Sequence, residues 1–367
     1  MQKNNKLGFG LLVAMLLVSM AFVPAVSAQS TDEALDDKIV HSHQDKKFVC
    51  MVQNFSNPIS IKELNGTRET VINNYRKEKG TANNSIIYSV PQVPEGGRIV
   101  AYCFRINDDG TTSQYVGIAG DEKSVSKIRE RAKTWYNTEV LEFEKAETNI
   151  DSELISNNLS PTSSESGAQW SDPCRFYDDY YLSPYGGVTN NYELYCLYND
   201  GSSTVDWFAI VQEFGLEPGY RAFAPSSWKN DVGYAKQEWC DGNLGNPQLY
   251  SYRPNGPYTG QTSQSVTITG GSGGVSAGLT WTYTQPDVST ECYSSTNTDI
   301  AEWKITCNSD TAKTSTVGMN PGSTCSANQH SSGNYKILDV KGVGIFRESF
   351  LSSKILSTTS SPYISYN

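Results

Sequence analysis

The chain has 367 residues, a formal net charge of −10 at pH 7 and eight cysteines. An acidic surface repels phosphate backbones and anionic lipid headgroups, which argues against nucleic acid as a partner. With 37% hydrophobic and 11% aromatic residues, the chain is long enough and apolar enough to build more than one folded domain.

The first 28 residues predict a secretory signal peptide. Lys3 and Lys6 precede the uncharged run GFGLLVAMLLVSMAFV (8–23), and small residues at 26–28 suit cleavage before Gln29. An uncleaved anchor is the alternative, but the run is shorter than the about 20 apolar residues that span a bilayer. We therefore expect a secreted or cell-surface protein with a polar leader at 29–46.

Residues 47–145 predict a small α+β domain. KFVCMV (47–52) has the composition of a strand, and residues 59–80 are rich in helix formers, which predicts a helix. In residues 97–120 apolar and polar side chains alternate on both sides of a turn at Asp108–Gly110, which predicts a β-hairpin. Residues 121–137 predict a second helix that begins at Asp121 as N-cap. One side of this helix carries Val125, Ile128, Ala132 and Trp135.

Residues 146–169 are rich in Ser, Asn, Thr and acids, and predict a linker. Residues 170–367 hold six of the seven tryptophans and 17 of the 22 tyrosines, in short β-type runs separated by Gly and Pro. This pattern predicts an antiparallel β-sandwich or barrel. The predicted fold class is mostly β, with a small N-terminal α+β domain followed by a larger, disulfide-tied β-domain.

The cysteines support disulfides rather than metal ligation, because their number is even in an exported chain and no CxxC pair occurs. No metal and no cofactor are expected. Cys50 and Cys103 are the only cysteines of residues 47–145, so we predict a bridge between them. The disulfide candidates are Cys50, Cys103, Cys174, Cys196, Cys240, Cys292, Cys307 and Cys325.

Catalytic motifs are scarce. His41 and His43 lie in the polar leader and His330 in a predicted loop, which supports no Ser-His-Asp or Cys-His arrangement. HExxH, phosphate-loop and dinucleotide motifs do not occur. Two carboxylates would be enough for a glycoside hydrolase, but solvated loop acids are the simpler interpretation. The candidate acids are Asp178, Asp179, Asp206, Glu213, Glu238 and Glu302.

The segment FYDDYYLSPYGG (176–187) sets aromatic side chains among acids and glycines. Tyr and Trp rings stack on sugars and are enriched at protein interfaces, but they also build the cores of β-domains. If this cluster binds a glycan or a protein surface, we expect exposed aromatics on a concave β-face. The predicted contact residues are Tyr177, Tyr180, Tyr181, Tyr185 and Trp228.

The segment QTSQSVTITGGSGGVSAGLTWTYTQ (261–285) predicts a β-hairpin with a turn in GGSGG (270–274). It contains no charged residue, and each arm has the nine or ten residues of a tilted membrane-spanning strand. Ser and Thr occupy one face. The other face carries the membrane candidates Val266, Ile268, Val275, Leu279, Trp281 and Tyr283, together with Ala277.

This pattern resembles the membrane-inserting hairpin of β-pore-forming toxins. Any half-buried antiparallel hairpin alternates in the same way, so the simpler interpretation is a structural hairpin. A membrane-active hairpin is expected to pack loosely on the body, with its threonine side buried.

The sequence therefore predicts a non-enzymatic binding protein of the cell envelope or exterior, with a glycan or a surface protein as partner. The alternative is a pore-forming protein that inserts residues 261–284 into a membrane. A carboxylate-dependent glycoside hydrolase is a weaker alternative, to be recognised by two carboxylates that face each other across a cleft.

Overall fold

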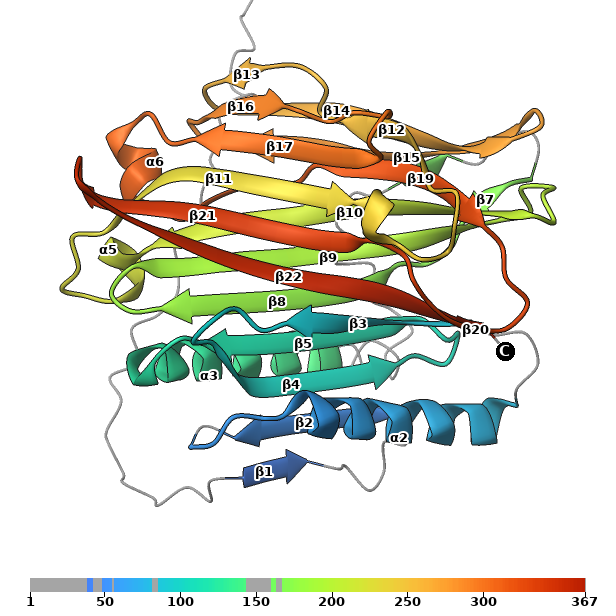
Figure 1. Cartoon of the computed structure of the whole chain (residues 1–367), viewed down its shortest axis with the longest axis horizontal. Helices are drawn as coiled ribbons and strands as arrows, with labels where there is room; N and C mark the ends of the chain where they lie inside the picture. Colours follow the sequence, from blue (N-terminus) through green and yellow to red (C-terminus); the bar gives the residue numbers. More distant parts are fainter. Residues whose placement is uncertain are drawn as a thin grey trace, which may run out of the picture. The chain divides into compact units, whose positions relative to one another are not determined.

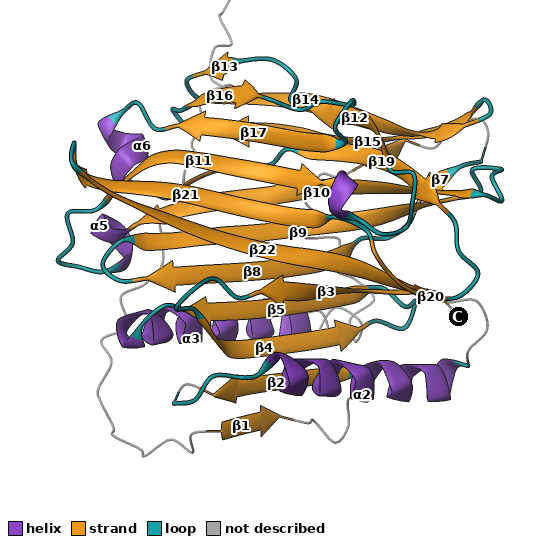
Figure 2. Ribbon diagram, viewed as in Figure 1, coloured by secondary structure: helices purple, strands orange, loops and turns teal. Residues whose placement is uncertain are grey.

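The computed structural model describes residues 38–41, 48–54, 56–80, 85–142, 160–162 and 167–366. It is mostly β, with a few helices and several antiparallel sheets (Figure 2). The predicted signal peptide, most of the leader and most of the linker lie outside the described residues. Among the described helices, none has the length and apolarity needed to cross a bilayer.

The larger of the two main sheets has eleven strands and contains segments from both predicted domains. Its central pairs are antiparallel, except that β5 and β8 run parallel to each other. In spatial order its strands are β1 (Lys38–His41), β2 (Val49–Asn54), β4 (Arg98–Ile106), β5 (Thr112–Ala119), β8 (Cys174–Leu182), β9 (Gly186–Tyr198), β10 (Val205–Pro218), β19 (Gly322–Asn328) and β12 (Gln248–Arg253), with β18 (Val317–Met319) on β10 and β7 (Gln169–Trp170) on β9.

The second main sheet has eight antiparallel strands and is built mainly from the C-terminal part of the chain (Figure 1). In spatial order these are β13 (Tyr258–Thr259), β16 (Ser289–Cys292), β17 (Ile300–Thr306), β11 (Lys229–Glu238), β21 (Asp339–Ser349), β22 (Ser352–Tyr366) and β20 (Gly333–Lys336), with β3 (Ile86–Gln92) on β22. Because β3 pairs with β22 and β5 with β8, the two predicted domains share both main sheets. Whether they fold as separate units stays a prediction.

The third sheet is the predicted hairpin, β14 (Thr262–Ser272) and β15 (Val275–Gln285), with the short strand β6 (Ser160–Thr162) on its outer edge. Gly273 and Gly274 form the turn with φ of 62° and 86°, a left-handed conformation that glycine adopts without strain. The hairpin is therefore confirmed, with arms of 11 residues each.

Both long helices occur where the sequence predicts them, and they cover opposite faces of β4. The Ser60 side chain caps α2 (Ile61–Lys79) by accepting a hydrogen bond from the Glu63 N–H, and Asp121 caps α3 (Glu122–Tyr136) in the same way. Tyr102 faces α2 and Cys103 faces α3. The short helical segments are Asn137–Glu142, α5 (Gly219–Ala222), Trp239–Asp241 and α6 (Asp310–Thr314).

The main core lies between the two large sheets, where small residues of one face large residues of the other. A Cβ added at Gly233 would lie 2.7 Å from the Phe214 ring, and one at Gly342 would lie 3.1 Å from the same ring. Glycines of β11 and β21 thus make room for Phe214, Leu216 and Val188, as dense interior packing requires.

The prediction of disulfides is not confirmed, because all eight cysteines are free thiols in the structure. Cys50 lies opposite Phe104 in the β2–β4 ladder, whereas Cys103 lies opposite Met51. Neighbouring residues of a strand point to opposite faces of the sheet, so the two thiols face away from each other. An even number of cysteines says nothing about which thiols meet, and this is why the prediction was wrong.

Candidate functional site

The β14–β15 hairpin has an uninterrupted ladder from Thr262↔Gln285 to Ser272↔Val275. Each cross-strand pair therefore falls wholly on one face. We call one face of the hairpin the apolar face; its apolar residues are Val266, Ile268, Val275, Ala277, Leu279, Trp281 and Tyr283, and it also carries Gln264, which lies opposite Tyr283. The opposite one is the threonine face; it comprises Ser263, Ser265, Thr267, Thr269, Ser276, Thr280, Thr282 and Thr284.

The apolar face packs on the body of the protein. Ile268 and Leu279 are fully buried, and Trp281 is 3% exposed. Two glycines allow the hairpin and the body to approach each other closely. A Cβ at Gly270 would lie 2.9 Å from the Trp170 ring, and a Cβ at Gly322 would lie 2.8 Å from the Trp281 ring. The apolar face thus closes a hydrophobic core, as the simpler interpretation of the sequence predicts.

The threonine face points to solvent. Ser263, Ser265, Thr267 and Thr269 are exposed, and the Thr267 and Thr280 hydroxyls lie 2.8 Å apart across the strands. A tightly packed apolar face with an exposed threonine face is the reverse of what we expected for a membrane-active hairpin. By that criterion the packing agrees with a structural hairpin, and its physical reason is that an apolar face in water has to be buried.

Hydrogen bonds from one loop residue hold the hairpin to the body. The Asn320 side chain accepts from the Thr284 N–H at 3.0 Å and donates to the Thr282 carbonyl at 3.0 Å. The Asn320 carbonyl accepts from the Trp281 indole N–H at 2.8 Å. In addition, the Thr324 hydroxyl donates to the Thr269 carbonyl at 2.6 Å. The attachment is made by side chains, not by a ladder to either main sheet.

The two strands leave the body at a well-defined root. Gly260, with φ of 77°, precedes β14, and Pro286 follows β15. The Gln285 side chain donates to the Gly260 carbonyl at 2.8 Å and to the Val288 carbonyl at 3.0 Å. A glycine and a proline therefore bound the hairpin at its root, and neither continues a regular β-ladder there.

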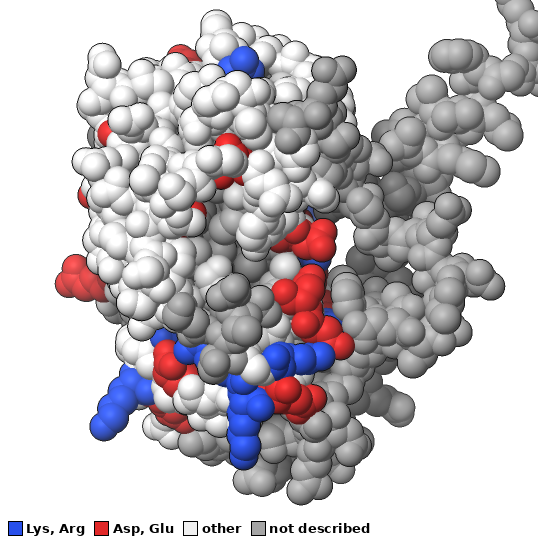
Figure 3. Space-filling model, turned by 90° about the vertical axis from the view of Figure 1, so that its right-hand side faces the viewer, with Lys and Arg blue, Asp and Glu red and all other residues white. Residues whose placement is uncertain are grey.

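The hairpin lies in a part of the surface that has few charges. No charged residue occurs between Gln261 and Gln285. In the face shown by Figure 3, the charged side chains gather in the lower half, and the upper half is largely free of them. In Figure 1 the turn of the hairpin lies at the right-hand end of the molecule, which is the end that faces the viewer in Figure 3.

The five predicted contact residues do not form one exposed platform. Tyr181 is fully buried and donates its hydroxyl proton to Glu217 at 2.7 Å, and Tyr180 is 3% exposed. Tyr177 is half-buried and donates to Glu139 at 2.8 Å. Tyr185 and Trp228 form a T-shaped pair at 4.6 Å, and both are half-buried. Ligand binding by these residues stays a prediction.

Asp178 and Asp179 lie on β8 and are both 1% exposed, so the interpretation as solvated loop acids was wrong for them. They point to opposite faces, as adjacent strand residues must. Asp179 accepts two hydrogen bonds from Arg131 of α3, at 2.6 and 2.8 Å. Burial between the sheets raises the pKa of Asp178 to about 7.

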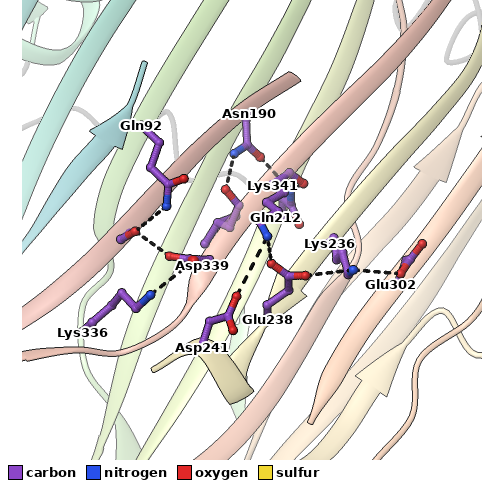
Figure 4. A network of polar contacts seen from close by, with 12 residues as sticks. Gln92, Asn190, Gln212, Lys236, Glu238, Asp241, Glu302, Lys336, Asp339 and Lys341 are labelled. Atoms are coloured by element: carbon purple, nitrogen blue, oxygen red, sulfur yellow. Dashed lines mark hydrogen bonds and ion pairs between the residues drawn. The ribbon is translucent and has the colours of Figure 1, made fainter. Parts of the chain in front are cut away.

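Two further candidate acids, Glu238 and Glu302, belong to one ion-pair network. Burial opposes the ionisation of Glu238, but contacts with Lys236 and Lys341 outweigh it and lower its pKa. Lys236 also reaches Glu302 at 3.5 Å (Figure 4). The remaining two candidates are Glu213, which is exposed, and Asp206, which contacts the Tyr366 hydroxyl.

Carboxylate oxygens of Glu238, Asp241 and Asp339 lie within 4.8 Å of one another, which is the spacing of an oxygen-ligand cation site. Ammonium groups already neutralise this cluster, because Lys336 lies 3.3 Å from Asp339 and Lys341 contacts Glu238 (Figure 4). The arrangement is that of a surface ion-pair network.

His330 is held by the structure and is not a free loop side chain. Its Nε2 lies 2.7 Å from the Leu244 carbonyl, and its ring stacks on Tyr335 at 3.8 Å. His41 and His43 fall on residues whose side chains are not described. The histidine contacts are therefore structural ones.

Sequence reasoning missed two features of the molecule. Asn320 is a single polar residue in a Met-Asn-Pro-Gly turn, and no local signal indicates that it holds a hairpin 36 residues earlier in the chain. The second feature is the Phe350–Leu351 pair, whose two adjacent apolar residues between charged neighbours (Glu348 and Lys354) were a detectable signal.

No protein-family model and no curated protein matches this chain. Among solved structures, it is similar to a chain described as a pore forming protein, with a TM-score of 0.35, 10% identity, and coverage of 56% of this chain and 95% of that chain. Clostridium perfringens delta-toxin has a TM-score of 0.32 and 10% identity, over 57% and 93% of the two chains. Clostridium perfringens NetB toxin in the membrane inserted form has a TM-score of 0.27 and 7% identity, over 54% and 95%. The likeness to these pore-forming toxins is one of fold alone.

Proposed function

We propose that the protein permeabilises membranes, and that the β14–β15 hairpin is the segment that inserts. The observation that carries the proposal is a charge-free, fully paired hairpin that, with the short strand β6, forms a sheet separate from both main sheets and buries only one face. This is the alternative that the sequence offered, and it replaces envelope binding as the main hypothesis.

The length of the hairpin supports the proposal. At about 3.3 Å per residue, an arm of 11 residues reaches roughly 36 Å, and a 45° tilt reduces its height to roughly 26 Å. The apolar band of a transmembrane barrel is about 25 Å tall. One arm is therefore long enough to cross a bilayer without help from other strands.

The two faces support it as well. In a barrel made from several copies, the apolar face would contact lipid and the threonine face would line a polar, uncharged channel. Trp281 and Tyr283 lie near the root of the hairpin, where they would sit at the membrane–water interface. The same alternation of apolar and polar side chains suits the hairpin packed on the body and the hairpin in a bilayer, because lipid then replaces the protein core as the partner of the apolar face.

The way the hairpin is attached makes its release feasible. Leaving the body breaks no ladder of the two main sheets; it breaks the Asn320 and Thr324 hydrogen bonds and the short pairing with β6. The main cost is exposure of the apolar face, on the order of 10 kcal/mol for six large or medium side chains in water. A membrane recovers that cost, so we expect insertion only where lipid is present.

The experiment is dye release from liposomes by the protein from Gln29 onward, with and without a disulfide between the hairpin and the body. Asn320→Cys and Thr284→Cys are suitable positions, since the Asn320 side chain reaches the Thr284 backbone. Cys240→Ser removes the exposed native thiol. We expect the oxidised double variant to be inactive and to regain release on reduction, whereas each single cysteine variant stays active throughout. Leakage that continues in the oxidised form would contradict the proposal.

A charge on the threonine face gives a second, independent readout. Thr267 is exposed in the soluble fold, so Thr267→Lys should leave stability within about 0.5 kcal/mol. If Thr267 lines a channel, this substitution shifts ion selectivity towards anions in planar bilayers, and Thr267→Glu shifts it towards cations. Thr296→Lys, on an exposed turn outside the hairpin, is the matched control. Equal selectivity in all variants would place Thr267 outside the pore.

A further inference from the structure

The turn between β21 and β22 exposes two large apolar side chains. Phe350 is 90% exposed and Leu351 is 91% exposed, the highest values among the large hydrophobic residues that the structure describes. They form the two-residue connection closed by the Ser349↔Ser352 pair. Such turns are normally made from Gly, Asn or Asp, so turn geometry does not account for Phe and Leu at this place.

Two further exposed apolar side chains belong to elements at this end of the sandwich. Ile355, also on β22, is 61% exposed, and Tyr220 of α5 is 54% exposed. The Tyr220 N–H donates to the Trp228 carbonyl at 2.8 Å, and Trp228 packs on Tyr185. In Figure 1 the β21–β22 turn lies at the same end of the sandwich as α5. We call Phe350, Leu351, Ile355 and Tyr220 the apolar tip.

The charges around the tip are mixed, with a small excess of cations. Arg347 contacts Asp231, and Glu348 contacts Ser227. Lys354 lies over the Tyr185 ring, with its Nζ 5.3 Å from the ring centre, and the exposed Lys229 is opposite Arg347 in the ladder. The three cations and two anions named here sum to +1, so this group does not repel anionic lipid headgroups as the net charge of −10 of the whole chain does.

We infer that the apolar tip docks the protein on the interface of a lipid bilayer. Aromatic and aliphatic side chains with Lys and Arg beside them are the composition of interfacial anchors. A protein partner fits the tip less well. The four side chains of the tip expose roughly 500–600 Å², which is below the about 800 Å² per partner that a stable protein interface buries.

The position of the hairpin is compatible with docking by the tip, although docking does not require the hairpin to move. In Figure 1 the turn between β14 and β15 lies at the end of the sandwich opposite to the β21–β22 turn, whereas β13 and β16, which flank the root of the hairpin in sequence, lie towards the β21–β22 turn. A bilayer at the tip would therefore be close to the root, about which the hairpin has to turn. Docking by the tip is a binding step that does not require the hairpin to insert.

The test is co-sedimentation with vesicles, using the oxidised Asn320→Cys/Thr284→Cys protein so that binding is measured without insertion. The vesicles are phosphatidylcholine alone, and phosphatidylcholine with phosphatidylglycerol in equal parts. Phe350→Ser/Leu351→Ser is expected to weaken binding tenfold or more on both. The control is Tyr198→Ser, which removes an exposed aromatic (56%) from the C-terminal end of β9 and should bind as before.

A fluorescent label shows which part of the protein meets the lipid. A bimane on Phe350→Cys is expected to shift to the blue with vesicles and to be quenched by nitroxide lipids, whereas a bimane on Tyr198→Cys is not. Unchanged binding by the double serine variant would overturn the inference. A lipid-free change in oligomeric state on loss of the tip would also overturn it, since the tip would then contact a second copy. A locked protein that binds but a released protein that never leaks would refute the pore and leave the docking tip standing.

Discussion

The buried carboxyl of Asp178 gives the sharpest prediction about stability. Asp178 is 1% exposed between the two main sheets, and its oxygens have no hydrogen-bond partner of normal geometry among the described residues. Burial raises its pKa from 3.8 to about 7, the neighbouring Asp179 adds to the rise, and the nearby Ser360 hydroxyl opposes it. The folded protein therefore holds a proton that the unfolded chain releases near pH 4.

The sign of the pH dependence follows from this difference. Between pH 4 and pH 7 the folded state binds more protons at Asp178 than the unfolded state, so stability falls as pH rises. The stabilising effect of protonation is complete below the unfolded pKa of 3.8 and is lost as pH passes about 7. A shift of about three units corresponds to about 4 kcal/mol between these limits.

The substitution Asp178→Asn removes this titration and keeps the shape. At pH 4 the variant is expected to equal the parent or to be about 1 kcal/mol less stable, because the amide adds donors to an apolar site. At pH 8 we expect it to be about 2–4 kcal/mol more stable, since the parent then buries a charge. Urea unfolding at a series of pH values measures the difference. A stability difference that does not change between pH 4 and pH 8 would refute the reasoning.

Three further predictions concern contacts in the same body. Asp179→Asn should destabilise the fold by about 1.5–3 kcal/mol at pH 7, because the amide keeps one acceptor but loses the charge that faces the Arg131 guanidinium. Adding Arg131→Met should recover part of this loss, and thermal unfolding of the single and double variants measures it. Gln212→Leu should lower the free energy of unfolding by about 2–4 kcal/mol, since the Gln212 amide donates to Asn190 at 2.7 Å and accepts from Gln237 at 3.2 Å in the buried core. A loss of stability below about 0.5 kcal/mol in urea unfolding would contradict this prediction. Trp281→Ala should cost about 3–5 kcal/mol through the cavity that it leaves against Gly322, and calorimetry would show an unchanged melting temperature if the apolar face were not packed.

Local patterns were sufficient for the elements of the fold. The caps at Ser60 and Asp121, the hairpin turn at Asp108–Gly110 and the alternation of residues 261–285 depend on residues within a few positions of one another. Their hydrogen bonds are short in sequence, so the residue types alone determine the element. The mostly β class follows from the same patterns.

The tertiary structure decided everything that depends on which faces meet. It placed β5 parallel to β8, turned Cys50 and Cys103 to opposite faces, and buried Tyr181 and Asp178 instead of exposing them. It also set Asn320 against the hairpin.

The sequence by itself determined that residues 261–285 form a two-faced, charge-free hairpin, and only the tertiary structure decided where each face lies. Alternation fixes which residues share a face, because side chains on a strand point to opposite sides in turn. It does not say whether the apolar face meets protein or lipid, since both remove it from water. In this structure that partner is the core around Trp170 and Trp207.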